Sequence, residues 1–124
     1  TGVTMADVNA DGWLDIYVCV SGHKDSTLRK NLLFVNNTDG TFTERAPAFG
    51  LASTRFSTQA AFFDFDRDGD LDMYLMNHSN KDRDATSLAP PLTDGTAYST
   101  DQLFENRKGR FVDVSHARGI RSEG

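Results

Sequence analysis

The sequence predicts an all-β protein made of two copies of one four-stranded antiparallel unit, and three observations support this fold class. Two acidic, glycine-containing segments match each other, DVNADGWLD at residues 7–15 and DFDRDGDLD at residues 64–72. Further short segments recur downstream of each. The apolar stretches between them are short, rich in β-branched and aromatic residues, and bounded by turn residues, which is typical of β-strands.

The internal repeat indicates how the chain is organised. Three segments of the first half recur in the second half after intervals of 57, 70 and 69 residues: 7–15 as 64–72, 31–36 as 101–106, and 40–44 as 109–113. The longer later intervals place an insertion in the second copy, at about residues 79–100. We therefore expect one unit at residues 1–56 and a second unit at residues 57–124.

Each unit is expected to contain four strands. They are expected at residues 3–6, 14–20, 32–36 and 41–44 in the first unit, and at residues 58–63, 71–77, 102–106 and 110–114 in the second. Asp39-Gly40 and Lys108-Gly109 predict two-residue hairpin turns between the third and fourth strands. Residues 46–50 and 115–119 are each expected to form one helical turn.

A four-stranded antiparallel unit that recurs at this interval is expected to be a blade of a β-propeller. Propellers usually have about four to eight blades, so two blades cannot close a ring. We therefore expect further blades, either in the same parent chain or in neighbouring copies.

The two acidic segments are expected to be metal-binding loops that join the first and second strands of each unit. Oxygen-bearing side chains occupy the first, third, fifth and ninth positions, a glycine at the sixth allows a tight turn, and the seventh residue can offer its backbone carbonyl. The expected ligands are Asp7, Asn9, Asp11, Trp13 and Asp15 in the first loop and Asp64, Asp66, Asp68, Asp70 and Asp72 in the second.

The ligand set favours calcium at both sites. An EF-hand would need a bidentate Glu at position twelve, where this chain has Val18 and Leu75. Zinc is disfavoured because neither loop contains His or Cys. Magnesium demands a more rigid shell, whereas calcium accepts six to eight oxygens in flexible geometry. The expected cofactor is therefore Ca²⁺, in a structural role.

Composition argues against several partners. A net charge of -5 and a pI near 5.0 disfavour nucleic acid, and no apolar run reaches the roughly 18 residues of a membrane span. If the parent protein is secreted, its signal is expected outside this segment. The single cysteine, Cys19, rules out an internal disulfide and is expected to be a buried strand residue.

No catalytic set is expected, because His23, His78 and His116 lie in three separate regions and none belongs to a nucleophile motif. Asn36 and Asn77 begin N-glycosylation sequons, whose occupancy the sequence does not decide. The 79–100 insertion is either a binding loop or a solvated excursion.

Three motifs, AFFDFDRDGDLDMYL at 61–75, NLLFVNN at 31–37 and DGTFTE at 39–44, make the chain similar to the FG-GAP or VCBS repeat, the blade of integrin-α-type propellers. The resemblance is closest to the bacterial branch found with cartilage-acidic-protein-like (ASPIC/UnbV) domains. It implies calcium-binding blades in secreted or surface proteins, commonly of Gram-negative bacteria, that serve adhesion, ligand binding or polysaccharide handling. The family's calcium ligands carry over to the ten positions named above.

The leading functional hypothesis is a non-enzymatic, calcium-stabilised pair of blades from an extracellular or cell-surface protein, with a role in adhesion or recognition of a protein or glycan ligand. A second hypothesis is a structural subunit that assembles head to tail into a ring or filament. A third is a non-catalytic segment of a polysaccharide-active enzyme.

Overall fold

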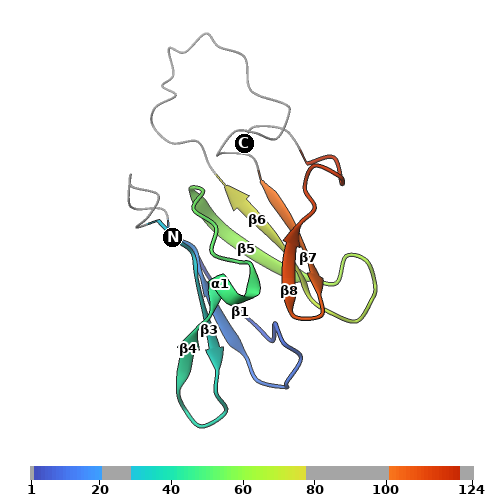
Figure 1. The fold of residues 1–124 in the computed structure, drawn as a ribbon. Helices are drawn as coiled ribbons and strands as arrows, with labels where there is room; N and C mark the ends of the chain where they lie inside the picture. Colours follow the sequence, from blue (N-terminus) through green and yellow to red (C-terminus); the bar gives the residue numbers. More distant parts are fainter. Residues whose placement is uncertain (1, 21–28, 78–100, 121–124) are drawn as a thin grey trace.

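A computed structural model describes residues 2–20, 29–77 and 101–120, which form two four-stranded antiparallel sheets (Figure 1). In each sheet the strands are hydrogen-bonded in chain order, which confirms the predicted pair of antiparallel units. The first sheet comprises β1 (Val3–Ala6), β2 (Asp15–Val18), β3 (Leu32–Asn36) and β4 (Phe42–Glu44); the second comprises β5 (Ser57–Phe63), β6 (Asp72–Asn77), β7 (Gln102–Arg107) and β8 (Arg110–Asp113).

Within the described residues the strand predictions were right in number and order; the bounds of β1 and β3 match, and the other six strands differ at one or both ends. The largest difference concerns β2, which is shorter than the predicted 14–20 because regular pairing with β3 begins at Ile16 and ends at Val18. Cys19 lies just beyond β2, where its amide donates to the carbonyl of Gly2 at 2.9 Å.

The two hairpins between the third and fourth strands differ by one residue. Arg107 pairs with Arg110, so Lys108 and Gly109 form the predicted two-residue turn, with φ of 56° and 89°. The prediction of a two-residue turn at Asp39-Gly40 was wrong. Asn37 donates its amide to the carbonyl of Thr41 at 2.9 Å, so three residues, 38–40, form that turn.

The hydrophobic core lies between the two sheets. Side chains that face each other in an antiparallel register share a face, and one face of each sheet contributes to the core. The first sheet supplies Ala6, Tyr17, Leu33 and Val35, and the second supplies Ala60, Phe62, Met73, Leu75, Phe104 and Phe111. The ring of Phe62 packs edge-on against Tyr17 and Phe111, with centroid distances of 5.9 and 6.4 Å.

The connection between the sheets contains α1 (Ala46–Phe49), the helical turn predicted at 46–50. It ends at Gly50 in the left-handed conformation, and the hydroxyl of Tyr17 donates to the carbonyl of Leu51 at 2.7 Å. The turn predicted to be helical at 115–119 instead forms hydrogen-bonded turns without a helix.

Strands β1 and β5 lie next to each other where the sheets meet (Figure 1). The Thr4 hydroxyl donates to the carbonyl of Ala60 at 2.8 Å, and the side-chain amide of Gln59 donates to the Thr4 hydroxyl at 2.9 Å. Within the described ranges, no helix is long and apolar enough to cross a membrane.

Candidate metal centre

The two acidic loops have the same backbone conformation. Their fourth residues, Ala10 and Arg67, have φ of 58° and 61°, and their sixth residues, Gly12 and Gly69, have φ of 87° and 93°. Glycine adopts this left-handed region at little cost, whereas a residue with a side chain is strained there. The loops therefore hold two strained residues in equivalent places, as the repeat predicts.

The first carboxylate of each loop caps the turn. Asp64 accepts the amides of Asp68 at 3.1 Å and Gly69 at 2.8 Å, one on each oxygen. Asp7 accepts the amides of Asp11 and Gly12 at the same two distances. These bonds satisfy loop amides that have no strand partner, so each loop is organised around its own acidic side chain.

The fifth carboxylate orients the seventh residue. Asp11 accepts the amide of Trp13, and Asp68 accepts the amide of Asp70, both at 2.9 Å. Each of these contacts is a local side-chain turn of the kind that Asp favours. Trp13 itself is half exposed.

The ninth carboxylate is buried and joins the loop to its sheet. Asp72 accepts the amide of Phe65 at 3.1 Å and the amide of Asn106 at 2.8 Å. Asp15 likewise accepts the amides of Val8 at 3.0 Å and Asn36 at 2.8 Å. Each loop is therefore tied to the third strand of its own unit.

The sequence reasoning missed the roles of Asn36 and Asn106. Besides their amides, their side chains donate to the carbonyls of Leu14 at 3.2 Å and Leu71 at 3.1 Å, which precede the ninth carboxylates. The signal was present, because the two asparagines occupy equivalent positions of the repeat. Their hydrogen bonds to the loops could not be inferred without knowing how the strands pair.

Four carboxylates converge in the second loop. Asp64, Asp66, Asp68 and Asp72 each place one oxygen within 4.8 Å of the others, and they are the one such acidic, His or Cys group of three or more among the described residues. The first loop brings Asp7, Asp11 and Asp15 to equivalent positions without the same close approach. The donor set fits a hard cation, because every side-chain donor is oxygen.

Electrostatics distinguish the carboxylates of the second loop. Burial, together with the charges of Asp72 and Asp68, raises the pKa of Asp66 to about 6. Burial raises the pKa of Asp72, opposed by the amides of Asn106 and Phe65. The pKa of Asp64 is lowered, because the amides of Gly69 and Asp68 outweigh its desolvation. The negative charge of the cluster is thus incompletely neutralised by the protein, and a cation would relieve the repulsion.

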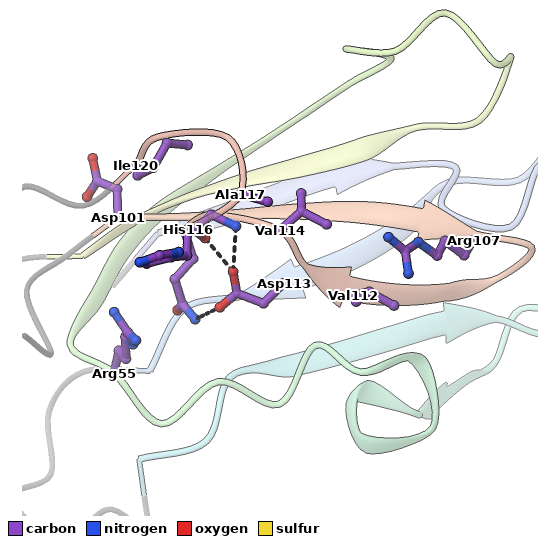
Figure 2. Close-up of a pocket in the computed structure, with 11 residues that line it drawn as sticks. Arg55, Asp101, Arg107, Val112, Asp113, Val114, His116, Ala117 and Ile120 are labelled. Carbon is purple, nitrogen blue, oxygen red and sulfur yellow. Dashed lines mark hydrogen bonds between the residues drawn. The ribbon is translucent and has the colours of Figure 1, made fainter. Parts of the chain in front are cut away.

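A separate hollow of about 590 Å³ lies along β7 and β8, lined by residues including Arg55, Asp101, Asp113 and His116 (Figure 2). Its carboxylates already accept structural hydrogen bonds. Asp101 accepts the Tyr74 hydroxyl at 2.8 Å, and Asp113 accepts the side chains of Gln102 and Ser115. The hollow is therefore shaped by groups that hold the second sheet together.

The remaining candidates from the sequence are placed as follows. Cys19 is buried, and burial raises the pKa of its thiol to about 11, so it remains protonated at neutral pH. Asn77 is buried, its side chain accepting from Ser57 and donating to Gln102, which leaves this sequon unsuited to modification in the folded protein. His23, His78 and the 79–100 insertion lie outside the described residues.

Two comparisons with known proteins bear on the chain. A family model described as an FG-GAP-like repeat matches residues 7–75. The match begins at the first carboxylate of the first loop and ends within β6, so it includes both acidic loops. A search of curated proteins found no match.

Proposed function

The chain belongs to the family of FG-GAP-like repeats, and on this premise we propose that it is a pair of calcium-stabilised propeller blades from an extracellular or cell-surface protein, with a role in adhesion or recognition. The first blade spans residues 1–56 and the second spans residues 57–124. The observation that carries the proposal is the convergence of four carboxylates in the loop between β5 and β6.

In this proposal each loop holds one calcium ion. The second site is formed by the side chains of Asp64, Asp66, Asp68 and Asp72 with the carbonyl of Asp70, and the first by Asp7, Asn9, Asp11 and Asp15 with the carbonyl of Trp13. The second site binds more tightly, because it has four carboxylates where the first has three. When bound, the ion supplies positive charge that offsets the mutual repulsion of these carboxylates.

The role of the ion is structural. Asp15 and Asp72 already accept backbone amides of the third strand of their units, so fixing the loop also fixes the pairing of the second and third strands. An ion that holds the loop closed therefore stabilises most of the sheet. Weak sites are adequate outside cells, where modules bind calcium with Kd of about 10⁻⁴ to 10⁻³ M.

The pattern of covered and uncovered faces supports stacking on further blades. β1 and β2 of the first sheet carry Val3, Met5, Ile16 and Val18 on the face turned away from the core. Their repeat equivalents in the second sheet are Ala60, Phe62, Met73 and Leu75, which the first sheet covers. Val3 and Met5 are 59% and 57% exposed, whereas Ala60 is 3% exposed.

The second sheet has the complementary uncovered face. Ala61, Phe63 and Tyr74 are the equivalents of Thr4, Ala6 and Tyr17, which face the second sheet, and Phe63 remains 42% exposed. The uncovered face of the first sheet is thus equivalent to the face of the second sheet that packs in the core. The uncovered face of the second sheet is equivalent to the face of the first sheet that packs there. This arrangement favours neighbours of the same kind, in the parent chain or by head-to-tail association of copies, which would form a ring or a filament.

Calorimetric titration of the 124-residue chain with Ca²⁺, Mg²⁺ and Zn²⁺ tests the proposed metal sites. We expect two calcium ions per chain, much weaker magnesium binding and no zinc binding at the loops. Thermal unfolding with calcium and with chelator gives the structural test, because a ligand that binds only the folded state raises Tm. Equal Tm values in both conditions would contradict the proposal.

A further inference from the structure

A path of hydrogen bonds joins the ninth carboxylates of the two loops. Asp15 accepts the amide of Val8 at 3.0 Å, and the carbonyl of Val8 accepts the side-chain amide of Asn106 at 3.4 Å. The backbone amide of Asn106 donates to Asp72 at 2.8 Å. Val8 belongs to the first loop, and Asn106 is near the end of β7, so the path crosses from one unit to the other.

This path lies inside the protein. The four residues of the path are each at most 4% exposed: Asp15, Val8, Asn106 and Asp72. Water therefore does not compete for these hydrogen bonds, and breaking one leaves a buried polar group unpaired, which costs free energy. Val8 and Asn106 also line a hollow of about 390 Å³, together with Asn9 of the first loop and Asp70 of the second. The two loops are therefore linked by hydrogen bonds and line the same hollow.

We propose that the two loops bind calcium cooperatively and that the side chain of Asn106 carries the coupling. This inference rests on the proposed metal sites. An ion in the second loop fixes Asp72, which holds the Asn106 amide; the Asn106 side chain then holds Val8 in the position that Asp15 requires. Ordering the first loop costs less once this has occurred, which is positive coupling without a large structural change.

Repulsion between the two bound ions opposes this coupling, so positive cooperativity requires the ordering carried by Asn106 to outweigh that repulsion. Because coupling of binding is reciprocal, an ion in the first loop raises the affinity of the second loop by the same factor.

The repeat provides a matched control. Asn36 occupies the equivalent position in the first unit, where its amide donates to Asp15 and its side chain donates to Leu14. Its side-chain oxygen accepts the amide of Thr38. These contacts stay within the first unit, whereas the Asn106 side chain reaches Val8. Asn36→Ala therefore removes the same local support without cutting the path.

Trp13 makes the first loop observable by itself, because it is the only tryptophan and is at the seventh position of that loop. The experiment follows Trp13 fluorescence during calcium titration of the full chain, with the second loop intact or weakened by Asp68→Asn. We expect Asp68→Asn to weaken calcium binding at the first loop by about five-fold or more. The same substitution should have no effect on the first loop in an Asn106→Ala background, and should keep its effect in an Asn36→Ala background.

Three outcomes overturn parts of this account separately. If both loops bind calcium but Asp68→Asn leaves the first loop unchanged, the coupling is wrong while the metal sites stand. If the effect of Asp68→Asn persists in Asn106→Ala, Asn106 does not carry the coupling. If neither fluorescence nor calorimetry detects calcium, the proposed function fails with it. Circular dichroism checks folding, and Asn106→Ser, too short to reach Val8, replaces Asn106→Ala if that variant does not fold.

Discussion

Asp72 has a different task from the other carboxylates of its loop, because both of its oxygens accept backbone amides while it is fully buried. Asp68 is exposed and accepts the local amide of Asp70. Asp72 therefore supports the fold as well as being a proposed ligand, whereas the side chain of Asp68 supports only a local turn besides its proposed role as a ligand.

Asp72→Asn should destabilise the protein even without calcium. The substituted side chain turns one NH₂ group toward a backbone amide and leaves a buried donor without an acceptor, which costs about 1–3 kcal/mol. Asp68→Asn should leave the stability in chelator nearly unchanged and reduce only the stabilisation by calcium. Urea unfolding of both variants, in chelator and in calcium, measures this. Equal losses in chelator would show that the distinction is wrong.

Asp113, at the end of β8, makes a pH-dependent contribution to the free energy of unfolding. Although its burial opposes ionisation, hydrogen bonds from Ser115 and Gln102 lower its pKa below the ordinary value of 3.8. A lowered folded-state pKa stabilises the protein above the unfolded-state pKa, and this stabilisation is lost as the pH falls through the folded-state pKa. We expect Asp113→Asn to lower the free energy of unfolding by about 1 kcal/mol at pH 7. In denaturant unfolding, the difference in this free energy between the variant and the wild type should shrink below about pH 4. A gap that stays constant from pH 7 to pH 3 would refute this assignment.

For individual residues, the sequence predicted which positions of the loops carry acidic side chains, but not which groups those side chains contact. The acidic positions of both loops could be identified because alternating oxygens around a glycine are a local pattern. Asn106 and Asn36 could not, since their function depends on strands more than twenty residues away in sequence. The hydrogen bond from the Asn106 side chain to the carbonyl of Val8 depends on how the two sheets pack.

At the scale of elements, the repeat predicts where turns occur, and the change of interval from 70 to 69 residues records a real difference between the hairpins. The first hairpin has one residue more, Thr38, whose φ is 66°. The Asp39-Gly40 signal obscured this because it matches a common two-residue turn. The alignment of the two units, rather than the Asp39-Gly40 dipeptide, indicated the correct length of the first turn.

Gly50 and Gly119 end equivalent segments of the two units and test how the units differ. Both have left-handed backbones, with φ of 77° and 82°, so alanine costs about 1–2 kcal/mol at either position. A Cβ at Gly50 would lie 2.4 Å from the carbonyl oxygen of Phe111, whereas a Cβ at Gly119 has open space.

Gly50→Ala should therefore be more destabilising than Gly119→Ala, by about 1–3 kcal/mol for the added crowding. Chemical denaturation of the two variants provides the comparison. Similar losses at the two positions would mean that the connection between the sheets can move away from β8.

At the scale of the whole molecule, the two sheets stack so that unlike faces meet, and among the described residues nothing covers the same unlike faces at the two ends. The repeat predicted two neighbouring blades, yet it did not determine which face of one unit would meet which face of the other. That choice follows from β1 lying beside β5 and from the short connection through α1.

Met5→Glu and Phe63→Glu test the stacking of the ends. We expect the wild-type chain with calcium to self-associate as its concentration rises, and either substitution alone to prevent this, because a buried unpaired charge is costly. A mixture of the two variants should form dimers and no larger species, since one intact pair of faces remains. Sedimentation velocity distinguishes these cases. A wild-type chain that stays monomeric at all concentrations, or a mixture that does not dimerise, would contradict head-to-tail stacking.

In the proposed function each acidic loop binds one calcium ion through its oxygen ligands. Long-wavelength anomalous diffraction from crystals grown with calcium tests it directly. We expect a strong peak among Asp64, Asp66, Asp68 and Asp72 and a second, weaker peak among Asp7, Asn9, Asp11 and Asp15. Ordered loops with no anomalous peak at either position would contradict it.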